Sequence, residues 1–155
     1  MAKGFRHSAG FGKRIEFWLI GRMLKAGLDV YVPLVDDFGI DAIIRKPDGG
    51  FIEVQIKARS NDVIPGDAAL FSAITHADVR ENYYFVFYSE RMHEMWILSS
   101  EEFNREAVRN RTGKNAGKRG IWFNLKRKDR ATGNLIELAN PRFDLYKQQD
   151  FSQFQ

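Results

Sequence analysis

The sequence contains no cysteine and only three histidines, His7, His76 and His93. Without cysteine the chain can form neither a disulfide framework nor a thiolate site for zinc or redox chemistry. The histidines lie far apart in the sequence, which argues against a histidine zinc site, because such sites usually draw on closely spaced ligands. No apolar run approaches the length that spans a bilayer, and the N-terminus lacks the apolar segment of a signal peptide. We therefore expect a cytoplasmic protein.

Length and composition fit one compact domain. A chain of 155 residues with 44% hydrophobic residues can bury a substantial core. The sequence shows neither an internal repeat nor a linker-like segment. We therefore predict that residues 1–155 form a single domain.

Positive charge is concentrated in one segment. The formal net charge is +4, yet residues 109–130 contain nine basic residues against one acidic residue, Asp129. A local excess of this kind indicates a surface that binds a polyanion. Trp122 and Phe123 in the segment could stack on bases, although the segment could instead be a flexible charged loop with core aromatics. We predict nucleic-acid contacts from six of its members: Lys114, Lys118, Arg119, Lys126, Arg127 and Lys128.

The first predicted element is a helix over residues 13–26. Its apolar residues, among them Phe17 and Trp18, form a broad stripe at helical spacing, and Gly27 is placed to end the helix. Glu16 lies at the rim of this stripe. A helix glutamate is usually solvated, but one whose neighbours ought to be buried is less ordinary.

The rest of the chain is predicted to combine strands with short helices. Ser99 and Glu102 have the spacing of a capping box, which opens a helix that we extend to Arg109. Residues 68–74 are ambiguous between strand and helix, and residues 148–155 allow no interpretation. Apolar runs predict strands at residues 28–33, 83–88, 95–98, 120–125 and 135–138.

A predicted β-hairpin over residues 39–59 organises the chain. In its second strand Glu53, Gln55 and Lys57 alternate with apolar residues, and a Pro-Asp-Gly-Gly turn separates the two strands. Asp41 shares a face with Gln55 and Lys57 only if odd-numbered residues of one strand lie opposite odd-numbered residues of the other. This pairing requires a loop with an odd number of residues. A three-residue loop with a left-handed glycine fits the sequence. The polar residues would then converge on one face, although a merely solvated sheet face could also carry them.

The order of these features resembles a known family. A helix with Glu16 is followed by a strand and by a hairpin that carries Asp41 and then Gln55-x-Lys57. This order resembles the PD-(D/E)XK nuclease superfamily, the fold of restriction endonucleases and archaeal Holliday-junction resolvases. The glutamine form is similar to the Mrr-type restriction branch and its small stand-alone relatives. The likeness covers residues 12–59, and beyond residue 109 there is no match.

The resemblance implies a fold and a set of roles. The fold would be α/β (α+β) with a restriction-endonuclease-like core, in which helices flank a central mixed β-sheet and the hairpin carries the site. Asp41 takes the place of the motif aspartate, Lys57 is the motif lysine, and Glu16 corresponds to a helix glutamate aimed at the metal. Gln55 stands where most members have Asp or Glu.

The implied chemistry is metal-dependent phosphodiester hydrolysis. This reaction needs a cation near the scissile group, an activated water and charge stabilisation, and oxygen ligands suit Mg²⁺. Asp41, Glu16 and Gln55 would bind Mg²⁺ (or Mn²⁺), with a backbone carbonyl near Ile56. Lys57 would orient or help deprotonate the attacking water and stabilise the transition-state charge.

Gln55 departs from the usual motif because it is neutral. We expect weaker Mg²⁺ binding, for which Glu53 on the same face could partly compensate, unless Glu53 is simply a solvated strand residue.

The leading interpretation is a nuclease that acts on DNA, in defence or repair. Two alternatives stay open: a catalytically degenerate member of the same fold that binds nucleic acid without cutting it, and a protein-interaction module. The sequence also leaves a homodimer open.

Overall fold

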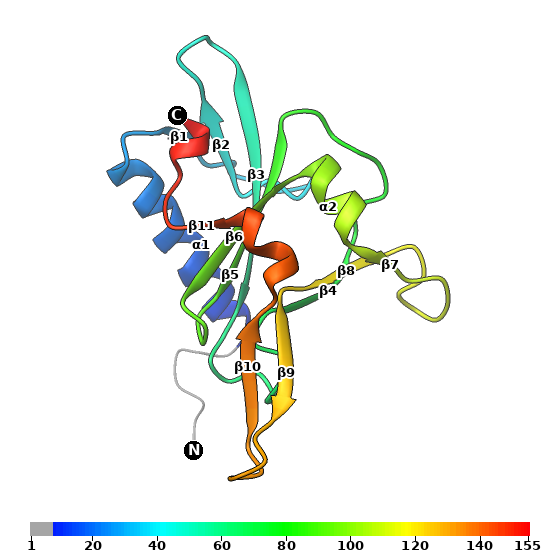
Figure 1. Cartoon of the computed structure of the whole chain (residues 1–155). Coiled ribbons are helices and arrows are strands. Elements are labelled where there is room, and N and C mark those ends of the chain that lie inside the picture. The colour runs from blue at the N-terminus through cyan, green and yellow to red at the C-terminus, as the bar shows by residue number, and fades with distance from the viewer. Residues whose placement is uncertain (1–7) are drawn as a thin grey trace.

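The computed structural model describes residues 8–155 and contains a central β-sheet with helices on both faces (Figure 1). The six strands of this sheet lie in the order β1-β2-β3-β5-β6-β11. β3 and β5 pair in parallel, and the other neighbouring strands pair antiparallel. The predicted α+β fold with a central mixed sheet is therefore confirmed. The strands are Asp29–Tyr31 (β1), Ala42–Arg45 (β2), Phe51–Arg59 (β3), Tyr83–Ser89 (β5), Glu94–Ser99 (β6) and Lys147–Gln148 (β11).

The β2–β3 hairpin has the register that its alternating residues predicted. Ala42 lies opposite Val54, so paired residues have numbers of the same parity. The backbone N–H of Lys46 donates to the carbonyl of Gly50, which closes a three-residue loop. Gly49 in this loop has a φ of 87°, the left-handed conformation that such a loop requires. The polar residues of the two strands therefore share one face.

Helix α1 (Ser8–Lys25) covers one face of the sheet and ends where the sequence predicted. Gly27 has a φ of 86°, and the N–H of Leu28 donates to the carbonyl of Met23, which is the hydrogen bond of a Schellman motif. The helix begins at Ser8 rather than at Lys13.

The predicted buried stripe of α1 is too broad. Leu19 and Met23 are fully buried, whereas Phe17 is 55% and Trp18 46% exposed. The expectation that these two aromatic residues belong to the core is therefore wrong. Trp18 lies at the margin of the helix contact, with its ring edge-on to Tyr88 at 5.1 Å between centroids.

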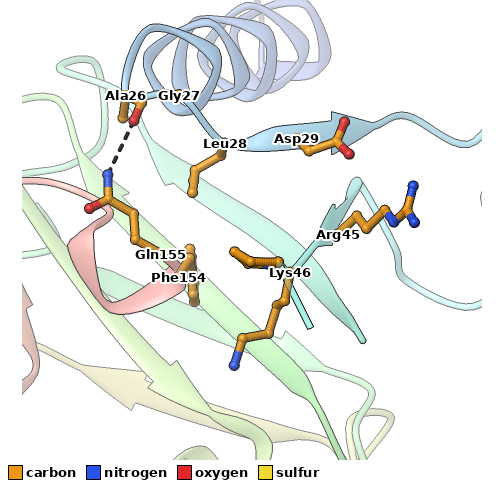
Figure 2. A pocket seen from close by; sticks show the side chains of 9 residues that line it. Ala26, Gly27, Leu28, Asp29, Arg45, Lys46, Phe154 and Gln155 are labelled. Atoms are coloured by element: carbon orange, nitrogen blue, oxygen red, sulfur yellow. Dashed lines mark hydrogen bonds between the residues drawn. The ribbon is translucent and has the colours of Figure 1, made fainter. Parts of the chain in front are cut away.

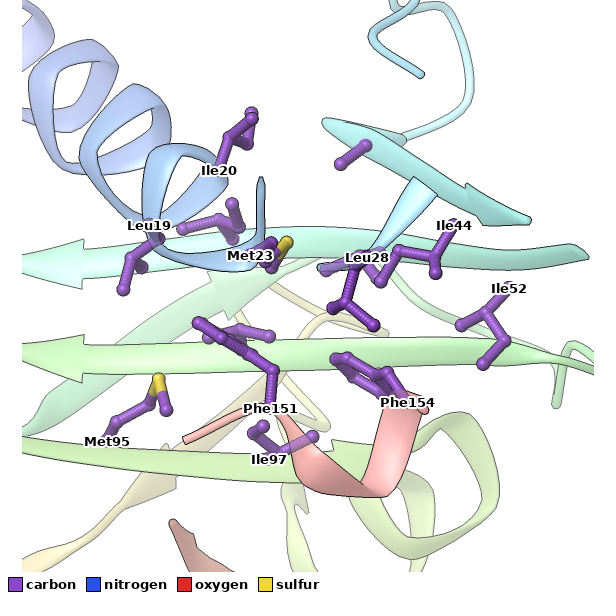
Figure 3. Close-up of a cluster of buried hydrophobic side chains, with 14 of the residues drawn as sticks. Leu19, Ile20, Met23, Leu28, Ile44, Ile52, Met95, Ile97, Phe151 and Phe154 are labelled. Atoms are coloured by element: carbon purple, nitrogen blue, oxygen red, sulfur yellow. The ribbon is translucent and has the colours of Figure 1, made fainter. Parts of the chain in front are cut away.

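The core under α1 is completed by the C-terminal residues. Phe151 and Phe154 are each 1% exposed and pack in one cluster with Leu19 and Ile97 (Figure 3). Phe154 ends the short 3₁₀ helix η2 (Ser152–Phe154). A segment that looks polar in the sequence thus provides two core aromatic residues.

The opposite face of β5 and β6 carries an aromatic core. Phe87 and Trp96 belong to the same buried cluster as Phe103 of helix α2 (Ser100–Glu106). Phe123 is also fully buried there and stacks on Trp96, with centroids 4.6 Å apart and planes 12° apart. Phe123 therefore cannot serve as the base-stacking surface considered from the sequence.

Helix α2 starts as predicted but is shorter. The capping box is present, because Ser99 Oγ accepts from the Glu102 N–H and the Glu102 carboxylate accepts from the Ser99 N–H. The predicted end at Arg109 is wrong. The chain leaves the helix at Ala107, and β7 (Val108–Arg109) pairs with another strand instead. Within residues 8–155 no helix is long and apolar enough to cross a membrane.

Two smaller sheets lie beside the central one. The first has the strand order β4-β8-β7, and the second is the pair β9–β10. The ambiguous residues 68–74 are thus mainly strand, and the predicted strand 120–125 is divided at Phe123. A 3₁₀ helix follows at Pro141–Tyr146 (η1). The strands of the smaller sheets are Leu70–Ile74 (β4), Arg119–Trp122 (β8), Asn124–Lys128 (β9) and Leu135–Ala139 (β10).

Candidate active site

Asp41 lies just before β2 and binds the neighbouring strand through its side chain. Its Oδ2 accepts a hydrogen bond of 2.7 Å from the backbone N–H of Ile56. Within residues 8–155 no hydrogen bond uses its second oxygen, Oδ1. Burial raises the pKa of Asp41, the Ile56 hydrogen bond opposes this shift, and the carboxylates of Glu16 and Asp36 raise the pKa further. The site therefore concentrates negative charge in a half-buried place.

Glu16 approaches this place from helix α1. Its side chain is buried, and the residue as a whole is only 9% exposed. Lys13, one turn earlier, donates to both carboxylate oxygens, at 3.0 and 3.2 Å. The charge of Glu16 contributes to the raised pKa of Asp41, after burial, so the helix carboxylate is within electrostatic range of the hairpin carboxylate. That the two hold one metal ion stays a prediction of the resemblance.

Lys57 lies on the same face of β3 as Gln55 and is half-buried. Within the described residues its ammonium group makes neither an ion pair nor a hydrogen bond. Its charge lowers the pKa of Asp41, although less than burial and the two neighbouring carboxylates raise it. An ammonium group without a protein partner is free to bind a phosphate oxygen or a water molecule.

Gln55 is tied to a partner that the sequence did not reveal. The buried hydroxyl of Tyr83 lies 3.0 Å from Gln55 Oε1 and 2.5 Å from the carbonyl oxygen of Gly39. A Cβ atom on Gly39, whose φ is 69°, would lie only 2.9 Å from Gln55 Nε2. The backbone conformation favours glycine at this position, and any larger residue would also have to displace the end of the Gln55 side chain.

The Tyr83 hydroxyl remains protonated because burial raises its pKa. One hydroxyl proton can be donated to only one of the two oxygens that Tyr83 faces. If the Gln55 amide turns over, its NH₂ group donates to the Tyr83 oxygen and its Oε1 points to the opposite side. In that orientation the Tyr83 hydroxyl donates to Gly39 and accepts from Gln55, so neither of its two contacts sets two acceptor oxygens against each other.

Glu53 is occupied by an ion pair. Arg80 donates to Glu53 Oε2 at 2.7 Å and to the carbonyl of Phe38 at 2.7 Å, and its guanidinium lies 4.1 Å from the centroid of the Tyr83 ring. Glu53 is therefore neither a free solvated residue nor a free carboxylate. Arg80 fixes the loop that precedes Asp41 and was not identified from the sequence.

A cleft of about 420 Å³ opens beside Gln55 and Lys57. His76 lines it, donates to or accepts from Ser100 Oγ at 2.6 Å, and stacks on Tyr83. Burial lowers the pKa of His76 to about 4, and the charge of Arg80 contributes to this shift. His76 is therefore neutral at pH 7.

A second hollow of about 420 Å³ lies at the other end of the hairpin (Figure 2). Leu28, Lys46 and Phe154 line it, and Gln155 closes one side through a hydrogen bond of 3.1 Å to the carbonyl of Ala26. None of the candidate site residues reaches this hollow, so it does not belong to the same site.

The donor set for a metal is small. Among residues 8–155 no group of three His, Cys, Asp or Glu side chains is placed to hold a metal ion. The available donors are the carboxylates of Asp41 and Glu16 and the amide of Gln55. Ile56 directs its N–H to Asp41, and the metal-facing carbonyl expected near Ile56 stays a prediction.

The six basic residues predicted to contact nucleic acid lie in three different places. Lys114 and Lys118 lie in the loop between β7 and β8, whereas Lys126, Arg127 and Lys128 lie on β9. Arg119 occupies a third position. Its guanidinium donates to the carbonyls of His76, Asn104 and Ala77, so it ties β8 to the body of the protein.

Comparison with known proteins supports the fold. No protein-family model matches the sequence, and no curated protein matches it. Among solved structures, the chain is similar to a bacterial homing endonuclease, I-Ssp6803I, with a TM-score of 0.58 and 18% sequence identity. The match covers 91% of this chain and 86% of that one. At this identity the likeness is one of fold, and this fold is found in a nuclease.

Proposed function

We propose that this protein is a nuclease that hydrolyses phosphodiester bonds of DNA with Mg²⁺ (or Mn²⁺). The observation that carries the proposal is that Glu16 of helix α1 and Lys57 of β3 both act electrostatically on the half-buried carboxylate of Asp41, which lies just before β2. The fold shared with a homing endonuclease supports it. The ammonium group of Lys57, which has no partner within residues 8–155, supports it as well, because a phosphate substrate is an anion.

The residues present fit a hard cation. Burial, and after it the repulsion of Glu16 and Asp36, raises the pKa of Asp41, and a bound cation would oppose both by favouring the ionised carboxylate. Mg²⁺ is commonly held by one or two carboxylates together with water and substrate oxygens, so a larger set of acids is not required. Asp41 and Glu16 would hold the ion, and Gln55 would add its amide oxygen in the orientation in which Tyr83 accepts from the amide. When bound, the ion would polarise the phosphoryl group and lower the pKa of a water ligand.

Lys57 would act on the attacking water and on the reacting phosphate. Its ammonium group can donate a hydrogen bond to the attacking water and orient it. As negative charge builds up on the phosphoryl oxygens, the same group stabilises that charge at close range. Glu53 and Gln55, on the same face of β3 as Lys57, are both held by hydrogen bonds, so β3 presents Lys57 from a fixed backbone.

Cleavage of supercoiled plasmid with Mg²⁺ or Mn²⁺ tests the proposal. We expect nicking that EDTA abolishes and that falls by about a hundredfold or more in Asp41→Asn and in Lys57→Ala. Asp29→Asn and Lys46→Ala remove the same charges away from the site and should nick at the wild-type rate. If both site variants nick as fast as the wild type, the proposed site is wrong.

A second candidate function is binding of nucleic acid without cleavage. It is favoured by the neutral Gln55 and by the lack of a three-member acid or histidine group among residues 8–155. This candidate predicts salt-sensitive DNA binding by the wild type, Asp41→Asn and Lys57→Ala alike, with no metal-dependent nicking by any of them.

A further inference from the structure

A two-stranded ribbon projects from the body of the protein. It consists of β9, β10 and the connecting residues 129–134, and we call it the basic ribbon. Figure 1 shows it extending well beyond the central sheet. The strands pair antiparallel from Asn124 opposite Ala139 to Lys128 opposite Leu135. Within residues 8–155 the two strands pair only with each other.

The base of the basic ribbon is fixed to the body by a buried side chain. Asn124 is 3% exposed, and its Nδ2 donates to the carbonyl of Gly66 while its Oδ1 accepts from the Ala69 N–H at 2.9 Å. Trp122 Nε1 donates to the same oxygen at 2.9 Å. The ribbon therefore leaves the body in a defined direction.

One face of the basic ribbon is turned towards the body. Glu137 on this face accepts from the Ala68 N–H at 2.8 Å and from Arg91 at 2.5 Å. Lys126, opposite Glu137, lies with its ammonium 4.6 Å from the centroid of the Trp122 ring. These contacts occupy the inner face.

The other face is open to solvent and combines apolar groups with one cation. Leu125 and Leu138 lie opposite each other and are 48% and 41% exposed. Arg127, the next residue on this face of β9, is exposed and lies opposite Ile136. A solvated ribbon has no need for three large apolar residues on its outer face.

The tip of the basic ribbon is an ordered turn. Asp129 accepts hydrogen bonds from the Ala131 N–H at 3.0 Å and the Thr132 hydroxyl at 2.8 Å. The turn presents Lys128 and Arg130, both exposed. Among the described residues neither of them, nor Arg127, forms an ion pair, so the ribbon offers its cations to an external anion.

We propose that the basic ribbon enters the major groove of duplex DNA, an inference that rests on DNA being the substrate of the proposed nuclease. The major groove of B-form DNA, about 12 Å wide, admits a two-stranded β-ribbon, whose strands are about 5 Å apart. Arg127 can donate two hydrogen bonds to a guanine edge, and Leu125 and Leu138 can contact thymine methyl groups. Lys128 and Arg130 at the tip contact phosphates.

Comparison of DNA and RNA duplexes separates groove entry from simple charge attraction. An RNA duplex carries the same phosphates, but its major groove is too deep and narrow for side chains to read. The probes are 30-base-pair DNA and RNA duplexes of matched sequence, labelled and titrated in EDTA so that cleavage plays no part. We expect the wild type to bind the DNA duplex about tenfold more tightly or better.

The variant Arg127→Ala with Arg130→Ala removes the central and tip cations. We expect it to lose about tenfold or more in affinity for the DNA duplex and at most about threefold for the RNA duplex. Lys25→Ala with Arg45→Ala removes two exposed cations elsewhere and should leave both affinities unchanged. A DNA duplex with 7-deazaguanine in place of guanine lacks the N7 acceptor, and it should weaken binding of the wild type but not of the ribbon variant.

If the ribbon variant lost equal affinity for the DNA and RNA duplexes, groove entry would be overturned. Such a result would mean that the ribbon contacts phosphates alone. Unchanged affinities would also overturn it and would leave the apolar face to a protein partner. The proposed nuclease is tested apart from this, by plasmid nicking. A wild type that prefers the DNA duplex through the ribbon yet never nicks would support the ribbon and reject the nuclease.

Discussion

Asp41 and Ile56 are joined by a side-chain hydrogen bond where the backbone ladder between β2 and β3 comes to its end. The carboxylate takes the place of a strand carbonyl and accepts from the Ile56 N–H at 2.7 Å. This contact fixes the carboxylate in a half-buried position next to two other acids, where burial raises its pKa. The ionised Asp41 carboxylate is therefore unfavourable in the folded protein, and we expect its charge to lower the stability of the protein without metal.

Asp41→Asn should make the protein without metal more stable at pH 7. The raised pKa means that the folded protein binds a proton more readily than the unfolded chain does. Stability therefore falls as the pH rises above the ordinary aspartate pKa of about 4, and the loss is complete above the folded pKa. Asparagine keeps the acceptor for Ile56 and removes the charge. Thermal unfolding in EDTA from pH 4 to 8 should show a higher melting temperature and a flatter profile for the variant. Asp29→Asn is the control, and a lower melting temperature for Asp41→Asn would contradict the placement.

Gln55→Glu should tighten Mg²⁺ binding and destabilise the protein without metal. The new carboxylate adds a hard ligand but also adds a negative charge beside Asp41 and Glu16. The melting temperature should fall in EDTA and rise more steeply with added Mg²⁺ than in the wild type. Gln153→Glu, on the exposed part of η2, tests the effect of charge alone. A response to Mg²⁺ no larger than that of the wild type would remove Gln55 from the metal site.

Gly39→Ala and Gly27→Ala form a matched pair. Both glycines have positive φ, so alanine at either position costs about 1–2 kcal/mol of backbone strain. A Cβ on Gly27 meets nothing within 4 Å, whereas one on Gly39 meets Gln55 Nε2 at 2.9 Å. Urea unfolding should therefore show that Gly39→Ala lowers the free energy of unfolding by about 1 kcal/mol or more beyond the effect of Gly27→Ala. Gly39→Ala should also reduce nicking, because it displaces Gln55. Equal losses of stability would show that Gln55 moves aside freely.

His76 should make the protein sensitive to mild acid. Its pKa is lowered to about 4 in the folded state, so the unfolded chain takes up a proton at higher pH than the folded protein does. The stability that neutral His76 contributes is present above its ordinary pKa of about 6.5 and is lost as the pH falls towards 4, by roughly 2 kcal/mol. Chemical unfolding at pH 7 and pH 5 should show this difference in the wild type but not in His76→Gln. His93→Asn, at an exposed left-handed position, should keep the wild-type difference.

The hairpin was predictable because its constraints are local. Alternating residues and a turn rich in glycine determine which residues face each other, so the shared face of Asp41, Gln55 and Lys57 followed from parity alone. Gly27 as the end of α1 is a similarly local signal. The conformation of these elements is determined by residues within them, so the sequence alone predicts it.

The partners of the site were not predictable because they come from distant strands. Tyr83 reaches Gln55 only because β3 and β5 pair in parallel, in a register that places Gln55 opposite Phe85. The sequence YYFVFY indicates a buried strand but not its neighbour. Arg80, which binds Glu53, lies in a loop without periodicity.

The errors have the same origin. Phe17 and Trp18 fit a helical stripe, but the width of the stripe that is buried depends on what packs against the helix. Phe151 and Phe154 lie in a short polar segment whose burial is decided by the gap between α1 and the sheet. The end of α2 is decided by β8, which pairs with Val108.

The single parallel pairing in the central sheet has a consequence for the order of folding. The β2–β3 and β5–β6 hairpins each join strands that follow one another along the chain, so each can form early and by itself. The β3–β5 seam joins them only after a long loop has closed, and the hydrogen bond between Gln55 and Tyr83 crosses that seam. The contact of Gln55 with Tyr83 therefore forms only when this seam closes. A chain that has formed both hairpins but has not docked them already has Asp41, Gln55 and Lys57 on one face, and it lacks the partner that holds Gln55.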